Sequence, residues 1–508
     1  MSMQPNEQRG LRLGGPRRWR PGRTTLVVMT TLVLLAAVVG YALLTRYAPN
    51  RPVTYSTVEE HFKYGSIGSD IETGLPVKIL MVLPRMFPEY LPEGAPQDLT
   101  AFGFIQEPGQ PLPIGFSMRR RIVDVAGFNC AFCHVGVVRE SPEADPAMYL
   151  GMPSNTVDLL AFSDFLIAAV NDPRFNAEDI LAALQQDESL NAVDRVIYRL
   201  AIPRMRDGLL ERQKQQAAFM PPGHPRFGPG RIDTFNSYKT NHFAEYYPDG
   251  VPDEERIGTA DFPSIWNQSV REGMNLHWDG NNTSVRERNF SAAFGAGATR
   301  ENIDSAAIDR IKVWIDALQA PPYPFARAND PQVLARGQQV FEQACASCHA
   351  LTGDAVGQVV PIAEIGTDPG RLNSYTEKLA GLQLAYGKGY DWEFKSFRKT
   401  EGYANSPLDG IWARAPYLHN GSVPTMWDLL TPEAQRNNGQ TTFYAGHGVY
   451  DSENMGFRTD VDAINGRPSF LFDTTLPGNG NQGHTGERYG TELSDEDKRA
   501  LIEYLKGY

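Results

Sequence analysis

The pentapeptides Cys130-Ala131-Phe132-Cys133-His134 and Cys345-Ala346-Ser347-Cys348-His349 decide the fold of this chain. Cys-x-x-Cys-His is the attachment signature of c-type haem. In that signature the two thiols form thioethers to the haem, and the adjacent histidine ligates the iron from the proximal side. The chain has 4 cysteines and the two motifs use them all, so none is left for a disulfide. The sequence therefore predicts two covalently bound haem c groups.

Two other uses of paired cysteines fit the pattern less well. A structural zinc site takes four ligands in a tetrahedron, commonly from two Cys-x-x-Cys pairs or from a Cys pair and a spaced His pair. Here each histidine directly follows its cysteine, which is poor geometry for one shared metal ion. A thioredoxin-like dithiol would explain a Cys-x-x-Cys, but not the following histidine in both motifs. We therefore expect His134 and His349 to be the proximal iron ligands.

An uncharged apolar segment runs from Thr24 to Thr45 and is about long enough to cross a bilayer. One glutamate precedes it, against six arginines at positions 9, 12, 17, 18, 20 and 23. The positive-inside rule then keeps the short tail in the cytoplasm and exports the rest. The apolar run exceeds a typical signal-peptide core and no convincing cleavage site follows it, which favours an uncleaved anchor over a cleaved signal. The prediction is a single-pass protein of the bacterial inner membrane with its soluble domains in the periplasm, where bacteria attach haem c.

Charge and composition bound the classes of partner. The net charge of −12 argues against nucleic acid and against an anionic membrane surface as partners. It would suit a basic redox partner, although acidic exported proteins are common. With 47 glycines, 37 prolines and 21% charged residues, the chain is expected to have helices joined by long ordered loops rather than disorder.

The second motif lies in a segment bounded by two expected helices. Residues 330–349 predict a helix that runs into the motif, in which Gly337 would let another helix approach closely. Near the C-terminus, Ser494 is an expected N-cap, and Leu501 and Leu505 share one apolar face of the helix that follows. Such terminal helices crossing beside the haem are typical of a small c-type cytochrome domain.

The first unit closes in a similar way. Between Asp304 and Leu318, isoleucines repeat at helical spacing, which predicts a core helix. The prolines within residues 320–324 then break the helix and form a stiff connector. We therefore expect a domain boundary near residue 326.

The region between the motifs is long, with expected helices around residues 155–170 and 177–199 and a loop-rich run after them. It is more than a carrier of one haem needs, and it indicates a pocket wall or lid. The predicted fold is mainly α, with two cytochrome c-like haem domains and long loops, preceded by one N-terminal transmembrane helix. Its parts are a cytoplasmic tail (1–23), the anchor (24–45), an N-terminal haem c domain with an expanded insertion (46–325) and a C-terminal cytochrome c domain (326–508).

Two further motifs resemble those of the di-haem cytochrome c peroxidase and MauG superfamily. Leu276-His277-Trp278-Asp279-Gly280 lies between the haem motifs, and APYLHNGSVPT (415–425) follows the second one. The superfamily carries a Phe-Trp-Asp-Gly-Arg motif and a Pro-Tyr-Met-His-Asp/Asn-Gly motif in this order. The resemblance covers roughly residues 120–508. It is closest to the branch of rubber oxygenase and the di-haem fatty-acid dioxygenases, on the phrases HWDGNNTS (277–284), GYANSPLDGIWARAPYLHNGSVP (402–424), YDSENMGF (450–457) and GHTGERYGTELSDEDKRALIEYLK (483–506).

The resemblance implies roles for several residues. Trp278 would sit between the haems and help electrons pass, its alternative being a buried core tryptophan. His419 would lie near the haems without ligating. His277 would contact the residues around the iron rather than the iron itself. Arg231 is a candidate partner of a haem propionate, because a guanidinium forks onto a carboxylate, or else forms an ordinary salt bridge. Calcium bridges the domains in several superfamily members, but scattered Asp and Asn residues assign no ligand to it here.

One departure from the superfamily concerns the open side of the first haem. Peroxidases carry a Gln and a Glu about ten and about twenty residues beyond the tryptophan, and the Glu moves protons as peroxide is split. Those positions are Arg288 and Ala298 here, and an alanine cannot carry a proton. The surrounding run is small and apolar, with Phe294 a candidate to pack over the haem. Such a pocket suits O2 and a hydrocarbon-like substrate better than peroxide.

The sixth ligand of the second iron has four candidates, which are His484, His447, Met426 and Met455. The resemblance favours His484, because the branch carries a ligating histidine in a Gly-His stretch shortly before its last helix. Nothing marks a sixth ligand for the first iron, and an open position is what catalysis requires. The remaining histidines are expected at the surface or hydrogen-bonded in the core, at positions 61, 224 and 242.

These expectations lead to a di-haem oxidoreductase that uses O2 on carbon–carbon double bonds of an apolar unsaturated substrate. The second, bis-histidine haem would store or relay an electron through Trp278. The alternatives are a hydrogen-peroxide peroxidase that receives electrons from a small electron-transfer partner, a non-enzymatic electron carrier, and a MauG-like modifier of a partner protein. No residue of the sequence selects the last of these.

Overall fold

A computed structural model describes residues 22–187, 190–220 and 223–508, and the chain divides into two compact units after Asn50. The first unit contains helix α1 (Arg23–Tyr47), whose mean hydropathy reaches 2.5 and whose side chains are all unburied. This confirms the expected helix. It is long and apolar enough to cross a membrane, and a signal sequence would have the same properties, so the anchor stays a prediction.

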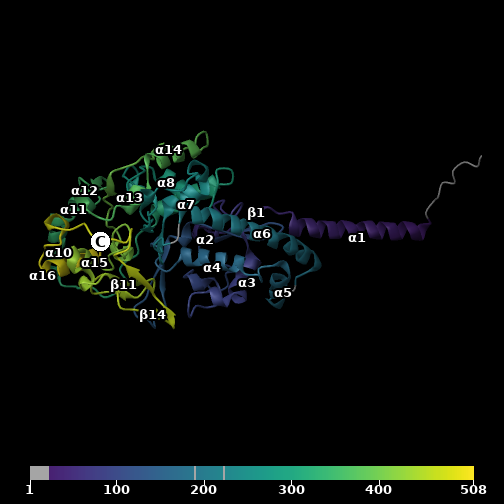
Figure 1. Ribbon diagram of the computed structural model, residues 1–508, viewed down its shortest axis with the longest axis horizontal. Helices are drawn as coiled ribbons and strands as arrows, with labels where there is room; N and C mark the ends of the chain where they lie inside the picture. The colour runs from purple at the N-terminus through teal and green to yellow at the C-terminus, as the bar shows by residue number, and fades with distance from the viewer. Residues whose placement is uncertain (1–21, 188–189, 221–222) are drawn as a thin grey trace, which may run out of the picture. The chain divides into compact units, whose positions relative to one another are not determined.

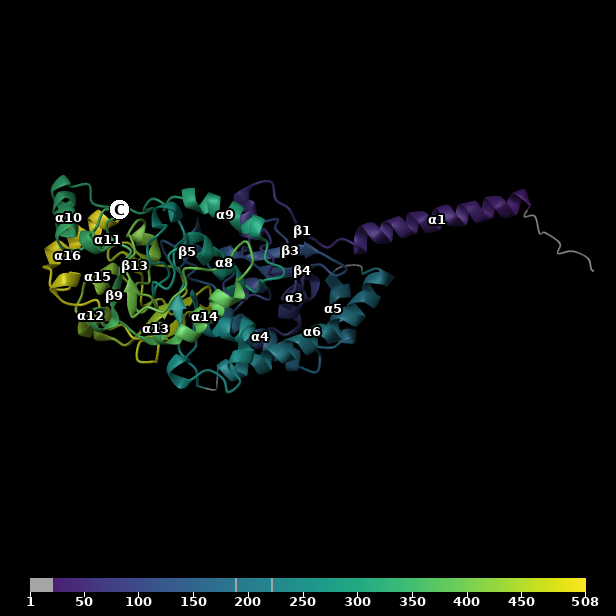
Figure 2. The same cartoon turned by 90° about the horizontal axis from the view of Figure 1, so that it is seen from above.

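The second unit, Arg51–Tyr508, is predominantly helical, as Figures 1 and 2 show. Its α-helices are α2 (Val58–Tyr64), α3 (Val77–Met86), α4 (Leu159–Asn171), α5 (Ala177–Asp187), α6 (Ala192–Phe219), α7 (Thr234–His242), α8 (Val285–Gly295), α9 (Ser305–Ala317), α10 (Pro331–Ala344), α11 (Ala346–His349), α12 (Ile362–Ile365), α13 (Gly370–Ser374), α14 (Glu377–Tyr386), α15 (Met426–Leu429) and α16 (Asp495–Leu505).

The strands are short and pair antiparallel. A four-stranded sheet has the order β1 (Arg51–Pro52), β3 (Phe116–Arg120), β4 (Val125–Phe128) and β2 (Leu75–Pro76). The two-stranded pairs are β5 (Val135–Val138) with β6 (Ala147–Leu150), β7 (Arg231–Ile232) with β8 (Ala260–Asp261), β9 (Val359–Pro361) with β10 (Gly402–Ala404), β11 (Thr442–Ala445) with β16 (Phe470–Asp473), β12 (Tyr450–Asp451) with β13 (Gly456–Phe457), and β14 (Ala463–Ile464) with β15 (Arg467–Pro468). The first haem motif directly follows β4.

Two hydrophobic cores lie within this unit. The first packs the side chains of α2 to α9 and α14 around a group of phenylalanines that includes Phe102 and Phe162. The second packs α10, α15 and α16 with Trp266 and Trp412. The proline-rich connector 320–324 is held against the second core, because Trp412 Nε1 donates a hydrogen bond of 2.8 Å to the Pro321 carbonyl. The division of the chain near residue 326 remains a prediction.

Side-chain caps explain where the expected helices begin. Asp304 caps α9, accepting a hydrogen bond from the Ala307 N–H at 2.9 Å. Ser494 caps α16 in the same way, as predicted. Ser and Asp side chains satisfy the otherwise unpaired N–H groups of a first helical turn, which is why both residues stand at these ends.

The insertion differs from the prediction in one respect. The helix expected over 177–199 is two helices, because α5 ends at Asp187 and α6 begins at Ala192. Asn191 caps α6 through a hydrogen bond from the Asp194 N–H at 2.8 Å, and asparagine favours such a cap over a helix interior. Helix α6 packs against both α4 and α5, so the three form one helical wall (Figure 2).

Helix α10 crosses α16 at Gly337, and this contact yields a test of the fold. A Cβ at Gly337 would lie 2.1 Å from the Ala500 carbonyl oxygen, which is backbone and cannot move aside. Gly337→Ala is therefore expected to lower the free energy of unfolding by about 1–3 kcal/mol, as overpacking does. Urea denaturation of the haem-loaded chain measures this.

Gly381→Ala is the matched control, since Gly381 lies in α14 and a Cβ there meets nothing within 4 Å. It should raise stability by up to about 1 kcal/mol, the ordinary helix-propensity gain. Equal effects of the two substitutions would contradict the close crossing.

Candidate functional site

The first motif opens onto a cavity in the first half of the unit. Cys130, Cys133 and His134 line this cavity of about 160 Å³. The His134 Nδ1 lies 2.9 Å from the Pro263 carbonyl oxygen, to which it can only donate. The Nε2 is thereby left as the nitrogen that can bind a metal, the usual arrangement for a metal-bound histidine. Burial lowers the pKa of His134 to about 4, which keeps its imidazole in the neutral, ligating form at neutral pH.

The second motif has the same local geometry. Cys345, Cys348 and His349 line a cavity of about 240 Å³. The His349 Nδ1 lies 2.8 Å from the Ser406 carbonyl oxygen, so its Nε2 is also the free nitrogen. Burial lowers the pKa of His349 as well. The two motifs thus present equivalent ligand sets to two different cavities, which disfavours a zinc ion shared between them.

His484 faces His349 across the second cavity. The ring centroids of the two histidines are 6.4 Å apart. Two imidazoles bound to opposite sides of one metal ion through bonds of about 2 Å place their ring centres roughly 6 Å apart, so this spacing fits a bis-histidine site. Burial lowers the pKa of His484 to about 3, and its Nδ1 has no hydrogen-bond partner in the described chain.

A buried arginine holds the loop that carries His484. The guanidinium of Arg436 donates hydrogen bonds to the carbonyls of Asn481, of Gly483 (2.9 Å) and of His484 (3.2 Å). The His484 N–H in turn donates to the Ile365 carbonyl at 2.8 Å. With these contacts His484 keeps a left-handed backbone conformation, φ 47°, which is uncommon for a residue other than glycine.

The other candidates for the sixth ligand are placed differently. His447 is saturated, because its Nε2 is near the Tyr444 and Arg458 carbonyls and its Nδ1 accepts from the Val449 N–H. Met455 is fully buried in the second core and is not among the described residues that line the cavity, whereas Met426 does line it.

Trp278 lies on the wall that the two cavities share. Five residues line both cavities, and they are Phe262, Pro263, His277, Trp278 and Arg288. The Trp278 indole Nε1 donates a hydrogen bond of 3.1 Å to the Asp261 carbonyl, and its own carbonyl accepts from the Ala404 N–H at 2.8 Å. The tryptophan is therefore fixed at both its backbone and its ring, at the position between the two sites where the resemblance places it.

His419 packs beside this wall, on the side of the second cavity. Its ring stacks on Tyr403, with centroids 4.2 Å apart, and its Nε2 lies 3.1 Å from the Tyr403 hydroxyl. The Tyr403 hydroxyl donates its proton to the Asp368 carbonyl at 2.8 Å. Its oxygen can therefore accept a hydrogen bond from the protonated Nε2 of His419. Burial lowers the pKa of His419 to about 3. His419 lines the second cavity, and its non-ligating role stays a prediction.

Two buried cations test whether these cavities suit haem. Burial lowers the pKa values of Arg288 and Arg414 to about 10, so both stay protonated at neutral pH. The Arg288 Nη2 and the Arg414 Nε have no hydrogen-bond partner among the described residues. Arg414 is already paired with the Asp409 carboxylate, at 2.9 Å from its Nη2, whereas no ion pair is described for Arg288, which lines both cavities. A buried cation without a full set of partners is costly, and the propionates of a haem are anions onto which a guanidinium forks. The residues at both motifs therefore fit haem c.

Two predicted site residues, Phe294 and Arg231, are not among the described lining of the motif cavities. Phe294 is fully buried in an aromatic group with His242, Tyr386 and Trp392, and is not among the described lining of either motif cavity. The wall that α8 presents to the first cavity consists instead of Arg288, Asn289, Ser291, Ala292 and Gly295. A catalytic role for Phe294 stays a prediction without a contact to this cavity. Ala298, at the position of the peroxidase glutamate, is fully buried.

Arg231 is buried and bridges two segments of backbone. Its guanidinium donates to the Phe227 carbonyl at 2.9 Å and to the Asn479 Oδ1 at 2.7 Å, and it stacks over the Phe472 ring. Arg231 lines neither motif cavity in the described part of the chain, and a propionate contact remains a prediction. The histidines expected to be hydrogen-bonded are so, at positions 61, 224 and 242.

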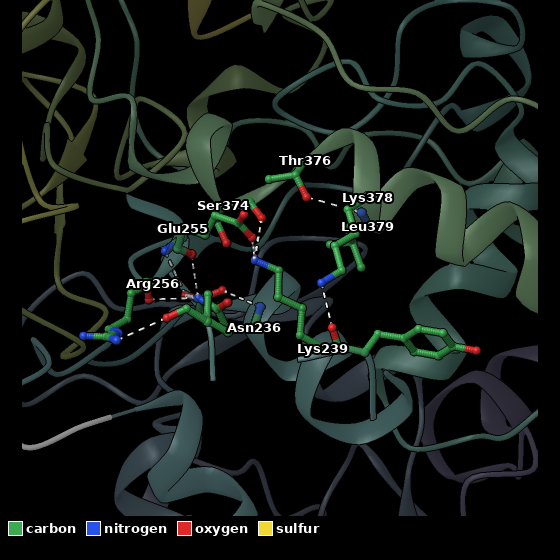
Figure 3. A network of polar contacts seen from close by, with 12 residues as sticks. Asn236, Lys239, Glu255, Arg256, Ser374, Thr376, Lys378 and Leu379 are labelled. Atoms are coloured by element: carbon green, nitrogen blue, oxygen red, sulfur yellow. Dashed lines mark hydrogen bonds and ion pairs between the residues drawn. The ribbon is translucent and has the colours of Figure 1, made fainter. Parts of the chain in front are cut away.

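Helix α7, which carries Tyr238 into the first cavity, is held by a buried polar network (Figure 3). Figure 3 shows Lys239 reaching from α7 toward Ser374 and Glu255. The Lys239 Nζ donates 2.9 Å hydrogen bonds to the Glu255 carboxylate and to the Ser374 carbonyl. Asn236, one turn earlier, donates to the Arg256 carbonyl at 2.8 Å. The network joins α7 to α13 and so fixes the position of α7 in the cavity wall.

Three residues of the site carried little signal of their role in the sequence. Arg288 was marked only as the position of a peroxidase glutamine, Tyr403 only as part of the phrase 402–424, and Arg436 by nothing beyond its residue type. The hydrogen-bond partners of Tyr403 and Arg436 lie in other segments of the chain, which spacing alone cannot reveal. Among the described residues no group of three or more His, Cys, Asp or Glu side chains gathers as a metal site, and nothing assigns a calcium ligand.

Comparisons with known proteins agree with a cytochrome c-like chain. Residues 402–439 match the family model described as "RoxA-like, cytochrome c-like". This segment carries Tyr403, Arg414, His419, Met426 and Arg436, the lining and support of the second cavity. The match covers a small part of the chain, and it supports a haem c redox function for that part.

Two curated proteins of Sinorhizobium fredii are similar over longer stretches. Uncharacterized protein y4iM is 30% identical over 292 residues, which are 48% of this chain and 64% of that protein. Uncharacterized protein y4iJ is 25% identical over 531 aligned residues, covering 80% of this chain and 84% of that protein. The chain thus spans less than two thirds of the length of y4iM. Among solved structures, hydrazine synthase of Kuenenia stuttgartiensis matches 53% of this chain and 80% of its own, at 17% identity and a TM-score of 0.26, a likeness that carries no argument.

The opposed histidines give a spectroscopic prediction. If His484 is the sixth ligand of the second iron, His484→Ala should leave that coordination position vacant. The share of reduced haem that binds CO should then rise from about half to nearly all. Visible spectra of the reduced chain with and without CO measure that share.

His447→Gln is the matched control, because His447 is held by backbone groups and should leave the spectrum unchanged. An unchanged CO-binding share in His484→Ala would show that another residue is the ligand.

Proposed function

We propose that the chain is a di-haem c-type oxidoreductase of the periplasmic side of the inner membrane that uses O2 to oxygenate carbon–carbon double bonds in an apolar substrate. The observation that carries the proposal is the unequal pair of cavities. In the second, the rings of His349 and His484 lie 6.4 Å apart, whereas in the first no such histidine pair is described, because the other histidine of its lining, His277, is hydrogen-bonded to Asn281. Transfer of both atoms of O2 to the two carbons of one double bond balances without an external reductant.

Haem c held by Cys130, Cys133 and His134 would supply the O2 chemistry, and haem c held by Cys345, Cys348, His349 and His484 would supply a store for one electron. The protein contributes the arrangement around both. Pro263 and Ser406 orient the two proximal histidines through their carbonyls. Trp278 occupies the wall common to both cavities and is the group best placed to pass electrons.

Small side chains on the side of the first cavity formed by α8 leave room for O2. Ser291, Ala292, Gly295 and Ala296 present them, beside Arg288 and Asn289 of the same helix, while the buried Asp261 lines the cavity from β8. Tyr238 donates its hydroxyl to the Ser291 backbone, and burial raises the pKa of Tyr238, so the phenol stays neutral. A carboxylate suited to moving protons during peroxide cleavage is not found on the α8 part of this wall, which the structure describes throughout.

Two alternatives remain distinct in their predictions. A peroxidase would oxidise a reduced small cytochrome in a peroxide-dependent way, taking two electrons per H2O2. A non-enzymatic carrier would have two six-coordinate irons. A simple electron carrier needs neither the cavity at the first motif nor the helical wall formed by α4, α5 and α6, and both features therefore disfavour it.

Addition of CO to the reduced, haem-loaded chain is the first test of the proposal. About half of the haem should shift its spectrum, because one iron is open and the other is closed by His484. The same preparation should consume O2 when an unsaturated lipid is added and should oxidise reduced cytochrome c with peroxide only slowly. A full absence of CO binding would favour the electron carrier, and fast peroxide turnover without O2 uptake would favour the peroxidase.

The relay role predicts a specific effect of Trp278→Phe. Electron transfer between the haems should slow, because the indole between the cavities is lost, while both haem spectra stay unchanged since Trp278 ligates neither iron. Flash photolysis of the half-reduced CO complex measures the rate.

Trp314→Phe is the control, since Trp314 packs on Phe62 in the first core, with ring centroids 5.1 Å apart. Equal rates in the two variants would remove Trp278 from the relay.

A further inference from the structure

The described lining of the first motif's cavity contains one carboxylic acid, Asp261 of β8. Its side chain is buried, and its Oδ1 has no hydrogen-bond partner among the described residues. Its backbone is held on both sides, because the carbonyl accepts the Trp278 indole N–H and the N–H donates to the His419 carbonyl at 3.0 Å. A carboxyl group is thus fixed beside the first site, and no contact described so far uses it.

Arg231 lies directly opposite Asp261 on the paired strands β7 and β8. Directly opposite residues of an antiparallel pair have Cβ atoms about 4.5–5.5 Å apart, so a salt bridge would be the ordinary outcome. No ion pair between the two is described. The guanidinium instead bonds the Phe227 carbonyl and the Asn479 Oδ1, and its Nε has no hydrogen-bond partner in the described chain. An unpaired donor and an unpaired acceptor therefore stand on opposite strands of one pair.

A small cavity of about 30 Å³ is lined by both of these residues and by Ser154. The Ser154 Oγ is a third buried atom without a hydrogen-bond partner in the part of the chain that the structure describes. The Ser154 N–H donates to the Cys133 carbonyl at 2.8 Å, which ties this cavity to the first haem motif. An internal water needs about 10–15 Å³ and 2–4 polar partners, and this cavity offers both.

The surroundings of Asp261 favour a protonated carboxyl. Burial raises the pKa of Asp261 well above its usual range, against the opposing effects of Arg231 and Arg371. Arg371, on α13, also lines the first cavity but is paired with the Asp279 carboxylate at 3.1 Å. Asp368 acts on Arg231 rather than on Asp261. The remaining titratable groups nearby are the cation Arg288 and the neutral His134, His277, Tyr238 and His419.

From this juxtaposition we propose that Ser154, Arg231 and Asp261 bind one internal water, through which Asp261 exchanges a proton as the first iron changes its oxidation state. When one electron passes from the first iron to the second, one proton leaves the Asp261 carboxyl through this water to the solvent. The carboxylate left behind offsets the positive charge gained at the first iron, and Arg231 pairs with it across the water. Electron and proton return together on re-reduction. The inference rests on the proposed function in assigning the electron exchange to two haems, and it depends on neither O2 nor the substrate.

Redox titration of the haem-loaded full chain without O2 tests the inference at equilibrium. Visible spectra at a series of pH values give the midpoint potentials of both haems. The potential of one haem should fall as the pH rises, because the carboxylate that forms at higher pH stabilises the oxidised iron. Asp261→Asn, which has no proton to release, should flatten this dependence. Its potential should match that of the parent chain at low pH and exceed it at high pH.

Asp249→Asn is the matched control, because Asp249 is exposed and lies outside the described linings of both cavities. It should titrate like the parent chain. A pH dependence in Asp261→Asn as steep as that of the parent would overturn the role of Asp261.

Infrared difference spectra test the proton and the water directly. Oxidation of the parent chain should remove the C=O band of a protonated carboxyl, a band that shifts in D2O and is missing in Asp261→Asn. Ser154→Ala should keep the band but shift it, because the water loses one of its partners. A parent chain without such a band, or an unshifted band in Ser154→Ala, would contradict the inference even if Asp261→Asn failed to fold. Since none of these readouts uses O2 or an unsaturated lipid, a failure of the oxygenase proposal is seen separately.

Discussion

The imidazoles of His134 and His349 are each held by one hydrogen bond from Nδ1 to a backbone carbonyl, and the rest of the site is arranged around these two bonds. The segment that supplies the Pro263 carbonyl also supplies the Asp261 carbonyl to the Trp278 indole. The segment that supplies Ser406 also supplies the Ala404 N–H to the Trp278 backbone. The same two loops therefore orient the two motif histidines and the tryptophan between their cavities, so a shift of either loop would move both a histidine and Trp278.

The interior of the protein is more basic than its surface charge suggests. The chain carries a net charge of −12, yet Arg231, Arg288, Arg414 and Arg436 are all withdrawn from solvent around the site, and burial lowers the pKa of each to about 10. Arg231 and Arg436 bond mainly to backbone carbonyls, and Arg231, Arg288 and Arg414 each keep one nitrogen without a hydrogen-bond partner among the described residues. Such an interior is costly for a polypeptide alone and becomes favourable when anionic groups of a cofactor enter it.

Local features of the chain were predictable from its sequence, and their meeting in space was not. The Cys-x-x-Cys-His motifs, the capped helices at Asp304 and Ser494, and the close crossing at Gly337 each depend on a few consecutive residues, and the structure has them. The sequence analysis expected one helix over residues 177–199 and did not identify Asn191 as an N-cap, so it missed the division between α5 and α6. Phe294 was assigned from the small apolar run around the position of the peroxidase glutamate, and Arg231 from the preference of a guanidinium for a carboxylate. Each packs against segments distant in the chain, and both roles stay predictions. Arg436 carried no pattern, because the carbonyls that it bonds at residues 481, 483 and 484 are distant in the chain, and Arg288 was marked only as the position of a peroxidase glutamine.

The loop of His484 has a consequence for redox tuning. In the proposed bis-histidine site, the axial ligand belongs to an irregular loop, and the guanidinium of Arg436 sets its position through three carbonyls. Axial ligation and the charge nearby are main determinants of the reduction potential of a haem. Residue 436, which lies outside the ligand set, is then a place where evolution can shift the midpoint potential of the second haem while the Cys-x-x-Cys-His motif and both histidines stay unchanged.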